Sequence, residues 1–258
     1  MKYILSILIC TFFYQIGVHA QEKTYILDTK KDLILSGVGI GLNVLALSIN
    51  TEGPTLEGID GLNENDLWSL DRSAIRNSSQ TAVTMSDVIL YSALSVPLAI
   101  YSDKKCRHEG LAIGIMGMEA FLLTNGLTVI TKKVVERYRP FVYNPNVPVQ
   151  EKLSSGARLS FFSGHTSMTT AMSFFATKVV TDLYPDMRHK WLAWTIGATT
   201  PALIGYLRYE GGKHFLTDVI TGYAVGALIG YFVPASHLNK KLNVGISFAG
   251  TLDFRYTF

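Results

Sequence analysis

The chain has 258 residues, enough for one or two domains, and 48% of them are apolar while only 17% are charged. Its mean hydropathy of +0.24 is high for a soluble enzyme and low for a membrane protein. The net charge of +3 is too small to indicate a nucleic-acid-binding protein, and the basic residues form short clusters between apolar runs, as at the ends of membrane spans.

Residues 1–20 have the pattern of a secretory signal: a basic residue at Lys2, an apolar centre, and a small-residue cleavage site before Gln21. The alternative is an uncleaved first membrane span. Of the two cysteines, Cys10 lies in this segment, so we expect no internal disulfide. No spacing of His, Cys or Glu in the sequence indicates zinc, and we expect no metal and no cofactor.

Six apolar segments follow, each long enough for a helix that could cross a bilayer. They are residues 33–50, 85–101, 111–131, 163–184, 191–207 and 215–233. Glu119 is the only charged residue of its segment, so it has either a functional role or a hydrogen bond to a neighbouring helix. Two stretches, 51–86 and 141–162, are polar and turn-rich, and we interpret them as surface loops with solvated acidic and basic residues.

The last residues, 243–258, alternate apolar and polar side chains, as strands do, with a turn at Ala249-Gly250. Two short strands cannot close a barrel, so a small hairpin or a loose tail is favoured. The fold prediction is all-α: a membrane-embedded bundle of about six helices with the active site at one end and a possible short C-terminal β-hairpin. Its expected parts are a signal (1–20), a helical domain (21–242) and a tail (243–258).

One polar stretch stands before the last apolar segment. Within it, His214 and Asp218 are four residues apart, so on a helix they would share one face. A carboxylate bound to one ring nitrogen fixes the tautomer and leaves the other nitrogen free as a base or nucleophile. Gly211-Gly212 would end the preceding helix and let Arg208 fold back over the same space. The alternative is a helix start with a surface His–Asp pair.

A second stretch, Ser163-Gly164-His165, begins a long apolar helix. A hydroxyl, free backbone N–H groups and the positive end of the helix dipole together make an anion site. The alternative is an ordinary serine N-cap with a surface His165.

A third stretch contains Lys132 and Arg139, seven residues and two helical turns apart, which would place them on one face. Pro140 would end that helix after Arg139. The alternative is a basic helix end in which Lys132 pairs with Glu136.

Together the three stretches resemble the type 2 phosphatidic acid phosphatase superfamily, which includes lipid phosphatases, bacterial acid phosphatases and vanadium haloperoxidases. The family pattern is Lys-x6-Arg-Pro, then Pro-Ser-Gly-His, then Ser-Arg-x5-His-x3-Asp. It is matched in order by Lys132, Arg139, Pro140, Ser163, Gly164, His165, Arg208, His214 and Asp218, over about a third of the chain. Phe162 and Leu207 replace the family's Pro and Ser, and neither change removes a charge.

The resemblance implies a role for each matched residue. His214 would be the nucleophile that forms a phosphohistidine, Asp218 would orient it, and His165 would protonate the leaving oxygen and then activate water. The expected phosphate-binding residues are Lys132, Arg139, Ser163, Gly164 and Arg208, without a metal.

The expected function is therefore a metal-independent phosphatase acting on a phosphate monoester or pyrophosphate, with a membrane lipid as the favoured substrate. The alternatives are a soluble-type periplasmic acid phosphatase with broad specificity, a vanadate-dependent haloperoxidase and a non-catalytic phosphate binder. The sequence gives no indication of oligomeric state and none of a nucleic-acid partner.

The basic clusters at 104–108, 188–190 and 240–241 all fall at the end of the bundle away from the motifs. The positive-inside rule predicts that this end is cytoplasmic, so the site would face the periplasm from the inner membrane of a bacterial cell envelope. A cleaved signal followed by a crossing at 33–50 predicts the opposite orientation, and the sequence does not reconcile the two.

Overall fold

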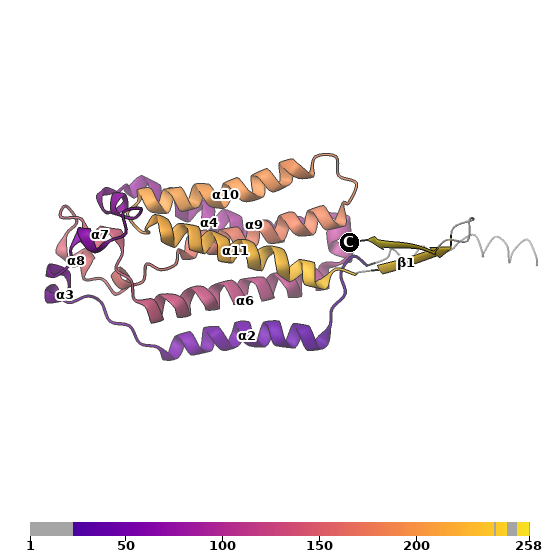
Figure 1. Cartoon of the computed structure of the whole chain (residues 1–258), viewed down its shortest axis with the longest axis horizontal. Coiled ribbons are helices and arrows are strands. Elements are labelled where there is room, and N and C mark those ends of the chain that lie inside the picture. The colour runs from indigo at the N-terminus through magenta and orange to yellow at the C-terminus, as the bar shows by residue number, and fades with distance from the viewer. Residues whose placement is uncertain (1–22, 240, 247–251, 258) are drawn as a thin grey trace, which may run out of the picture.

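The computed structural model describes residues 23–239, 241–246 and 252–257. Helices of 20 or more residues form an elongated bundle (Figure 1). They are α2 (Thr29–Ser48), α4 (Gln80–Ala99), α6 (Gly110–Val135), α9 (Gly164–Leu183), α10 (Lys190–Glu210) and α11 (Leu216–His237). Each overlaps one of the six apolar segments predicted from the sequence, and the prediction of a helical bundle is confirmed.

Helix α9 lies at the centre of the bundle and packs against α4, α6, α10 and α11. Its contact with α11 is close because the three glycines of α11 face the backbone of α9. A Cβ at Gly222 would lie 2.6 Å from Ser163 O, and Cβ atoms at Gly226 and Gly230 would collide with carbonyl oxygens one and two turns further along α9. Glycines four residues apart line one side of a helix, and the close approach that they permit fixes the position of α11 beside the start of α9.

The end of α6 differs from the prediction. The helix was expected to continue to Arg139, but it ends at Val135 because Glu136 adopts a left-handed conformation with φ of 45°. Pro140 instead begins the short helix α7 (Pro140–Tyr143), at a position where its missing N–H leaves no helical hydrogen bond unmade. Lys132 and Arg139 therefore lie on different elements.

Short helices gather at the two ends of the bundle. At one end lie α3 (Leu56–Asp60), α7, α8 (Val149–Lys152) and the 3-10 helices η1 (Glu64–Asp66), η2 (Arg72–Arg76) and η4 (Ser155–Arg158). At the other end lie η3 (Ile100–Ser102) and α5 (Lys104–His108). The predicted loops 51–86 and 141–162 thus contain short helices, which Figure 1 shows together beyond the ends of the long helices.

Two strands follow the bundle, β1 (Lys241–Ile246) and β2 (Leu252–Thr257), and pair antiparallel from Lys241 opposite Thr257 to Ile246 opposite Leu252. The predicted turn at Ala249-Gly250 and the predicted signal at 1–20 lie outside the described residues.

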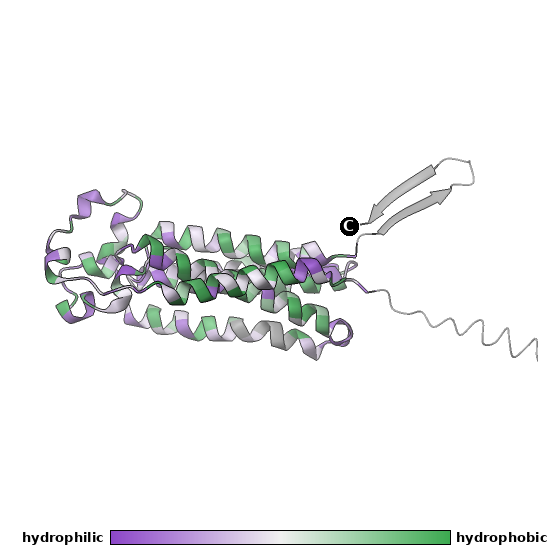
Figure 2. Cartoon of the chain, turned by 90° about the horizontal axis from the view of Figure 1, so that it is seen from below, coloured by the Kyte–Doolittle hydropathy of each residue, from purple (hydrophilic) through white to green (hydrophobic). Residues whose placement is uncertain are grey.

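Among the described residues, three segments are long and apolar enough to cross a membrane: α2, the segment Gly110–Tyr143 that contains α6, and α11. Each exposes some large apolar side chains, and in α2 these include Leu33, Val38, Val44 and Leu47, each at least half exposed. Figure 2 shows hydrophobic residues along the middle of the bundle and hydrophilic residues concentrated at its ends. Such a surface is stable in a hydrocarbon environment, so the chain is a membrane protein.

Candidate active site

The three sequence motifs meet at the end of the bundle where α6 and α10 end and α9 and α11 begin (Figure 1). The backbone N–H of Ser163 donates to Asp218 O at 3.0 Å, which ties the start of α9 to the first turn of α11. Lys132 approaches the same place from α6: a Cβ at Gly164 would lie 3.7 Å from Lys132 Cε. The three motifs, which are separated by tens of residues in the chain, thus lie together at one end of the bundle.

Lys132 and Arg139 converge although they lie on different elements. Lys132 Nζ donates to Leu159 O at 2.6 Å, and Arg139 NH2 lies 3.4 Å from the same oxygen. The alternative pairing of Lys132 with Glu136 is wrong, because Glu136 Oε2 pairs with Arg158 NH2 at 2.8 Å. The left-handed turn at Glu136 separates that carboxylate from Lys132 and leaves the ammonium group directed into the site.

His214 and Asp218 lie close together, but not on one helix face. His214 is in the turn that precedes α11, and Asp218 is in the first turn of that helix. His214 Nδ1 lies 3.6 Å from Asp218 Oδ2, which is longer than a hydrogen bond, and both side chains are almost fully buried. Since the surface pair of the alternative interpretation would be solvated, burial argues against it. Because catalytic hydrogen bonds are often long without substrate, the distance fits an orienting role for Asp218.

Asp218 is held by groups that the sequence motifs do not include. Its Oδ2 accepts from Ser160 Oγ at 2.5 Å and from the backbone N–H of Phe215 at 3.0 Å, and its Oδ1 accepts from Arg137 NH1 at 2.6 Å. These bonds leave the carboxylate little freedom to rotate. Asp218 therefore presents a fixed edge to His214.

Arg137 continues this network to the loop between α2 and α4. Its NH2 group pairs with Asp71 Oδ2 at 2.8 Å, and Asp71 also accepts from the backbone N–H and the hydroxyl of Thr217. Asp71 is only 1% exposed, so the prediction that the acidic residues of 51–86 are solvated is wrong for this one. Arg137 stands two residues before Arg139, and only its place inside the motif could have indicated a role.

The start of α9 has the predicted form. Ser163 is the N-cap, and its Oγ accepts from the N–H of Thr166 at 3.4 Å and from the Thr166 hydroxyl at 2.9 Å. Gly164 is the first residue of the helix, where backbone N–H groups have no partner within the helix. The cap interpretation and the anion-site interpretation are compatible here, because the capped turn directs free N–H groups toward the cations.

His165 and Arg208 share a carboxylate from α4 that sequence reasoning missed. Asp87 Oδ1 lies 2.7 Å from His165 Nε2 and 3.3 Å from Arg208 NH1. Arg208 also donates to Ser86 Oγ at 3.2 Å. Asp87 lies in an apolar segment far from the motifs, and no pattern there marks it as part of the site.

The electrostatics of the site favour an anion. Burial, followed by the positive charges of Lys132, Arg139 and Arg208, holds the pKa of His214 well below its usual range, so its imidazole is neutral. Among the described residues, the buried Nε atoms of Arg139 and Arg208 have no hydrogen-bond partner. Unpaired buried donors are costly, and a tetrahedral oxyanion between them would satisfy them. The site thus combines a buried, neutral imidazole with three basic side chains.

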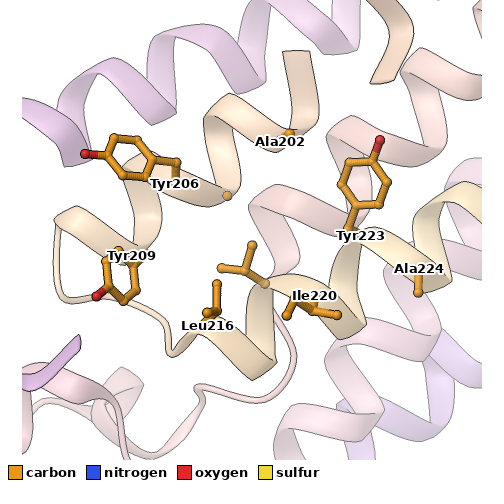
Figure 3. Close-up of a pocket in the computed structure, with 9 residues that line it drawn as sticks. Ala202, Tyr206, Tyr209, Leu216, Ile220, Tyr223 and Ala224 are labelled. Atoms are coloured by element: carbon orange, nitrogen blue, oxygen red, sulfur yellow. The ribbon is translucent and has the colours of Figure 1, made fainter. Parts of the chain in front are cut away.

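An apolar groove of about 580 Å³ lies between α10 and α11 (Figure 3). Tyr206 and Tyr209 line it from α10, and Leu216, Ile220 and Tyr223 from α11. Tyr209 follows Arg208 in the chain, and Leu216 is two residues from His214. Because Tyr206 and Ile220 are more than half exposed, the groove opens on the outer surface of the bundle.

The sequence profile of the PAP2 superfamily matches residues 114–242, half of the chain. The chain is 37% identical over 86 residues to a lipid A 4'-phosphatase of Porphyromonas gingivalis, which covers 33% of each protein. It is 30% identical over 120 residues to an undecaprenyl-diphosphatase of Sulfolobus acidocaldarius, covering 46% of this chain and 52% of that one. The chain thus aligns with between a third and about half of the length of these relatives.

A similar fold occurs in the transmembrane PAP2-type phosphatidylglycerolphosphate phosphatase of Bacillus subtilis. The TM-score is 0.50 at 20% identity, and the superposition covers 79% of this chain and 96% of the other. The profile match includes all three motifs, and the helical arrangement agrees with it. The chain belongs to the PAP2 superfamily.

Proposed function

We propose that this protein is a metal-independent phosphatase that hydrolyses a lipid phosphate or lipid pyrophosphate through a phosphohistidine at His214. The observation that carries the proposal is the convergence of Lys132, Arg139 and Arg208 on a buried, neutral His214, with unpaired guanidinium nitrogens among them. A mere binding site would not need a histidine aligned with a fixed carboxylate.

The geometry supports the following mechanism. Asp218 faces Nδ1 of His214, so Nε2 attacks phosphorus, and the bond from phosphorus to the leaving oxygen breaks. The three cations neutralise the equatorial oxygens, and the first N–H groups of α9 add donors. His165 gives its proton to the leaving oxygen. In the second step His165 takes a proton from water, the resulting hydroxide attacks phosphorus, and the P–N bond breaks to release phosphate.

The groove between α10 and α11 supports a lipid substrate. It is apolar and opens on the bundle surface, and its lining residues Tyr209 and Leu216 stand one and two positions along the chain from proposed phosphate-site residues. We assign it to an acyl or prenyl chain of the substrate. The named activities of the relatives, lipid A 4'-phosphatase and undecaprenyl-diphosphatase, are of the same chemical class.

We further propose that all six long helices are embedded in the inner membrane of a bacterial envelope, as one helical domain (21–242) followed by a tail (243–258), with the site facing the periplasm. Lys133 Nζ donates to Ala46 O and Ile49 O, so the end of α2 lies at the site end of the bundle. With the site outside, α2 starts in the cytoplasm, and residues 1–20 are then not removed as an export signal.

Orientation is measured with cysteine reporters at the two ends, Asn65→Cys and Arg188→Cys, in a chain that lacks its native cysteines. In intact spheroplasts, an impermeant maleimide should label position 65 and not position 188. The reverse labelling would place the site in the cytoplasm and would support a cleaved signal.

The function is tested by phosphate release from detergent-purified protein in EDTA, on a panel of lipid phosphates and pyrophosphates and on one soluble ester. We expect turnover on a lipid and little on the soluble ester. Strong turnover of the soluble ester would favour a broad-specificity acid phosphatase. Vanadate should inhibit release, whereas peroxidase activity with vanadate, or phosphate binding without turnover, would overturn the proposal.

The groove is tested with a matched pair of variants. Ala202 lines the groove, whereas its neighbour Leu203 is exposed and does not. Ala202→Trp should raise KM for the lipid by roughly tenfold through lost chain contacts, and should leave KM for a soluble ester unchanged. Leu203→Trp should change neither value. Equal effects of the two variants would remove the groove from the substrate site.

A further inference from the structure

A second cluster of chemically active side chains lies at the opposite end of the bundle, in the first turn of α2, within α6 and at the end of α11. His237 Nε2 lies 2.8 Å from Asp32 Oδ1 and 3.7 Å from Glu119 Oε2. The three ligand atoms all lie within 4.8 Å of one another. His237 and Glu119 are fully buried, and Asp32 is only 15% exposed.

The tautomer of His237 follows from its other nitrogen. Nδ1 lies 2.8 Å from Val233 O, and a carbonyl oxygen only accepts hydrogen bonds, so Nδ1 carries the proton. The Ser236 hydroxyl donates to the same oxygen at 2.8 Å, so it is not the donor to Nδ1. In the neutral imidazole, Nε2 then presents its lone pair to two carboxylates. This is the arrangement of a metal-binding histidine whose other N–H is held by the backbone.

A second proton on Nε2 of His237 would not provide hydrogen bonds to both carboxylates. It would bond to Asp32, the nearer carboxylate, and leave Glu119 without a partner. Within the described part of the chain, Glu119 Oε2 is buried and has no hydrogen bond, while Oε1 has only a long contact of 3.5 Å with Ser36 Oγ. A buried, unpaired carboxylate oxygen is costly, and one cation between the three groups would serve all of them.

We propose that Asp32, Glu119 and His237 bind one divalent transition-metal ion such as Zn²⁺. One imidazole and two carboxylates are ligands that such ions accept. At metal–ligand distances of about 2.1 Å, tetrahedral ligands lie about 3.4 Å apart, so Glu119 is already near its position and Asp32 needs to withdraw by roughly half an ångström. A water molecule completes the shell on the side of Asp32, the partly exposed ligand.

Nearby positive charge is already engaged. Lys31 Nζ, the ammonium group next to Asp32 in the chain, donates to Ser236 O at 2.8 Å. Its charge offsets part of the negative charge of the two carboxylates. It donates to a backbone carbonyl, however, and makes no hydrogen bond to Glu119 Oε2. No zinc spacing is visible in the sequence because the ligands stand at positions 32, 119 and 237, one on each of three helices.

The site would be structural. His237 stands nineteen positions after Asp218 in α11, which is roughly 28.5 Å at the helical rise of 1.5 Å per residue. An ion bound to three helices would fasten α2, whose side chains are mostly exposed, to α6 and α11. Metal removal should therefore lower thermal stability and leave the chemistry at His214 unchanged.

The test uses full-length protein in detergent, stripped with EDTA, incubated with Zn²⁺ and desalted. We expect close to one zinc per chain by elemental analysis and a higher unfolding temperature than in the stripped protein. Glu119→Gln and His237→Gln should each retain less than a tenth of this zinc and lose the temperature rise. Phosphate release by Glu119→Gln should equal that of the wild type, which shows that the variant is folded.

Glu136→Gln is the matched control, since it makes the same chemical change at the other end of α6, and it should retain the full amount of zinc. The proposal is overturned if the wild type retains no more zinc than Glu119→Gln, or if bound zinc gives no rise in unfolding temperature. Equal retention of Mg²⁺ and Zn²⁺ would also contradict it, because imidazole ligation favours the transition metal.

Discussion

Arg137 NH1 lies 2.6 Å from Asp218 Oδ1, and the same guanidinium reaches Asp71 Oδ2 with its other terminal nitrogen at 2.8 Å. One arginine from the segment after α6 thus holds two carboxylates that are almost completely buried. It also packs its guanidinium 4.2 Å from the centre of the Phe215 ring, next to His214 in the chain. The position of the proposed nucleophile depends on this residue, although no phosphate contact is assigned to it.

Removing that guanidinium should strongly lower both the stability of the protein and its activity. Arg137→Met leaves Asp71 and Asp218 buried without their cation, and breaking a buried pair costs about 3–5 kcal/mol. We expect a large fall in the unfolding temperature and loss of turnover. Arg158→Met breaks the Arg158–Glu136 pair, which is about 30% exposed on both sides, and should cost at most about 1 kcal/mol. Similar thermal shifts in the two variants would show that the Arg137 network is not a major structural element.

Arg208 should act mainly through phosphate binding. Its Nε is buried and unpaired in the described structure, so an oxyanion gains a charge-assisted bond there. Bonds to charged groups contribute about 1.5–3 kcal/mol, so Arg208→Ala should weaken vanadate and phosphate binding by roughly tenfold to a hundredfold. Inhibition constants and calorimetry measure this, with Arg158→Ala as the control. Unchanged binding of both anions would place Arg208 outside the pocket.

Asp87 is predicted to be a positioning residue for His165. Asp87→Asn removes the charge that holds the ring at 2.7 Å, so kcat should fall by roughly tenfold while KM changes little. The loss should be larger for an alkyl phosphate than for p-nitrophenyl phosphate, whose leaving oxygen needs no proton. A purely structural defect would reduce both substrates equally. Asp87→Glu should recover part of the activity on the alkyl phosphate.

The pH dependence should reflect the suppressed basicity of His214. Burial first, and then Lys132, Arg139 and Arg208, lower its pKa well below the ordinary value of about 6.5, so the nucleophile stays unprotonated through mildly acidic pH. We expect the acid limb of kcat/KM, corrected for titration of the substrate, below pH 6.5. Lys132→Met removes one positive charge and should move the limb to higher pH. A wild-type limb above 6.5, or a shift to lower pH in the variant, would contradict this.

Local rules accounted for the parts of the fold that depend on one segment at a time. Ser163 caps α9 as predicted because a serine before an apolar run meets the free N–H groups of the first turn. The glycines of α11 face the α9 backbone because a four-residue repeat lines one side of a helix. Only the family resemblance predicted that the motif residues meet in one site, because the number of residues between two positions does not determine their distance in space.

The wrong and missing sequence predictions concern features that depend on contacts between segments far apart in the chain. The prediction that α6 continues to Arg139 failed because Glu136 adopts a left-handed conformation that non-glycine residues rarely take. Asp71 and Asp87 were missed because their partners, Arg137 and His165, stand more than sixty residues further along the chain. A lone carboxylate in a loop or an apolar helix has no periodic signal, and only the packed structure shows which cation faces it.

Transfer of phosphate to His214 can be observed by rapid quenching with a lipid substrate that carries a labelled phosphate. We expect a labelled protein intermediate, labile in acid and stable in alkali, that forms and decays at rates sufficient for turnover. The label should map to the peptide that contains His214. His214→Ala should form no such intermediate and should not turn over, while its vanadate binding stays close to that of the wild type. Label on a different residue, or wild-type turnover in His214→Ala, would contradict the account.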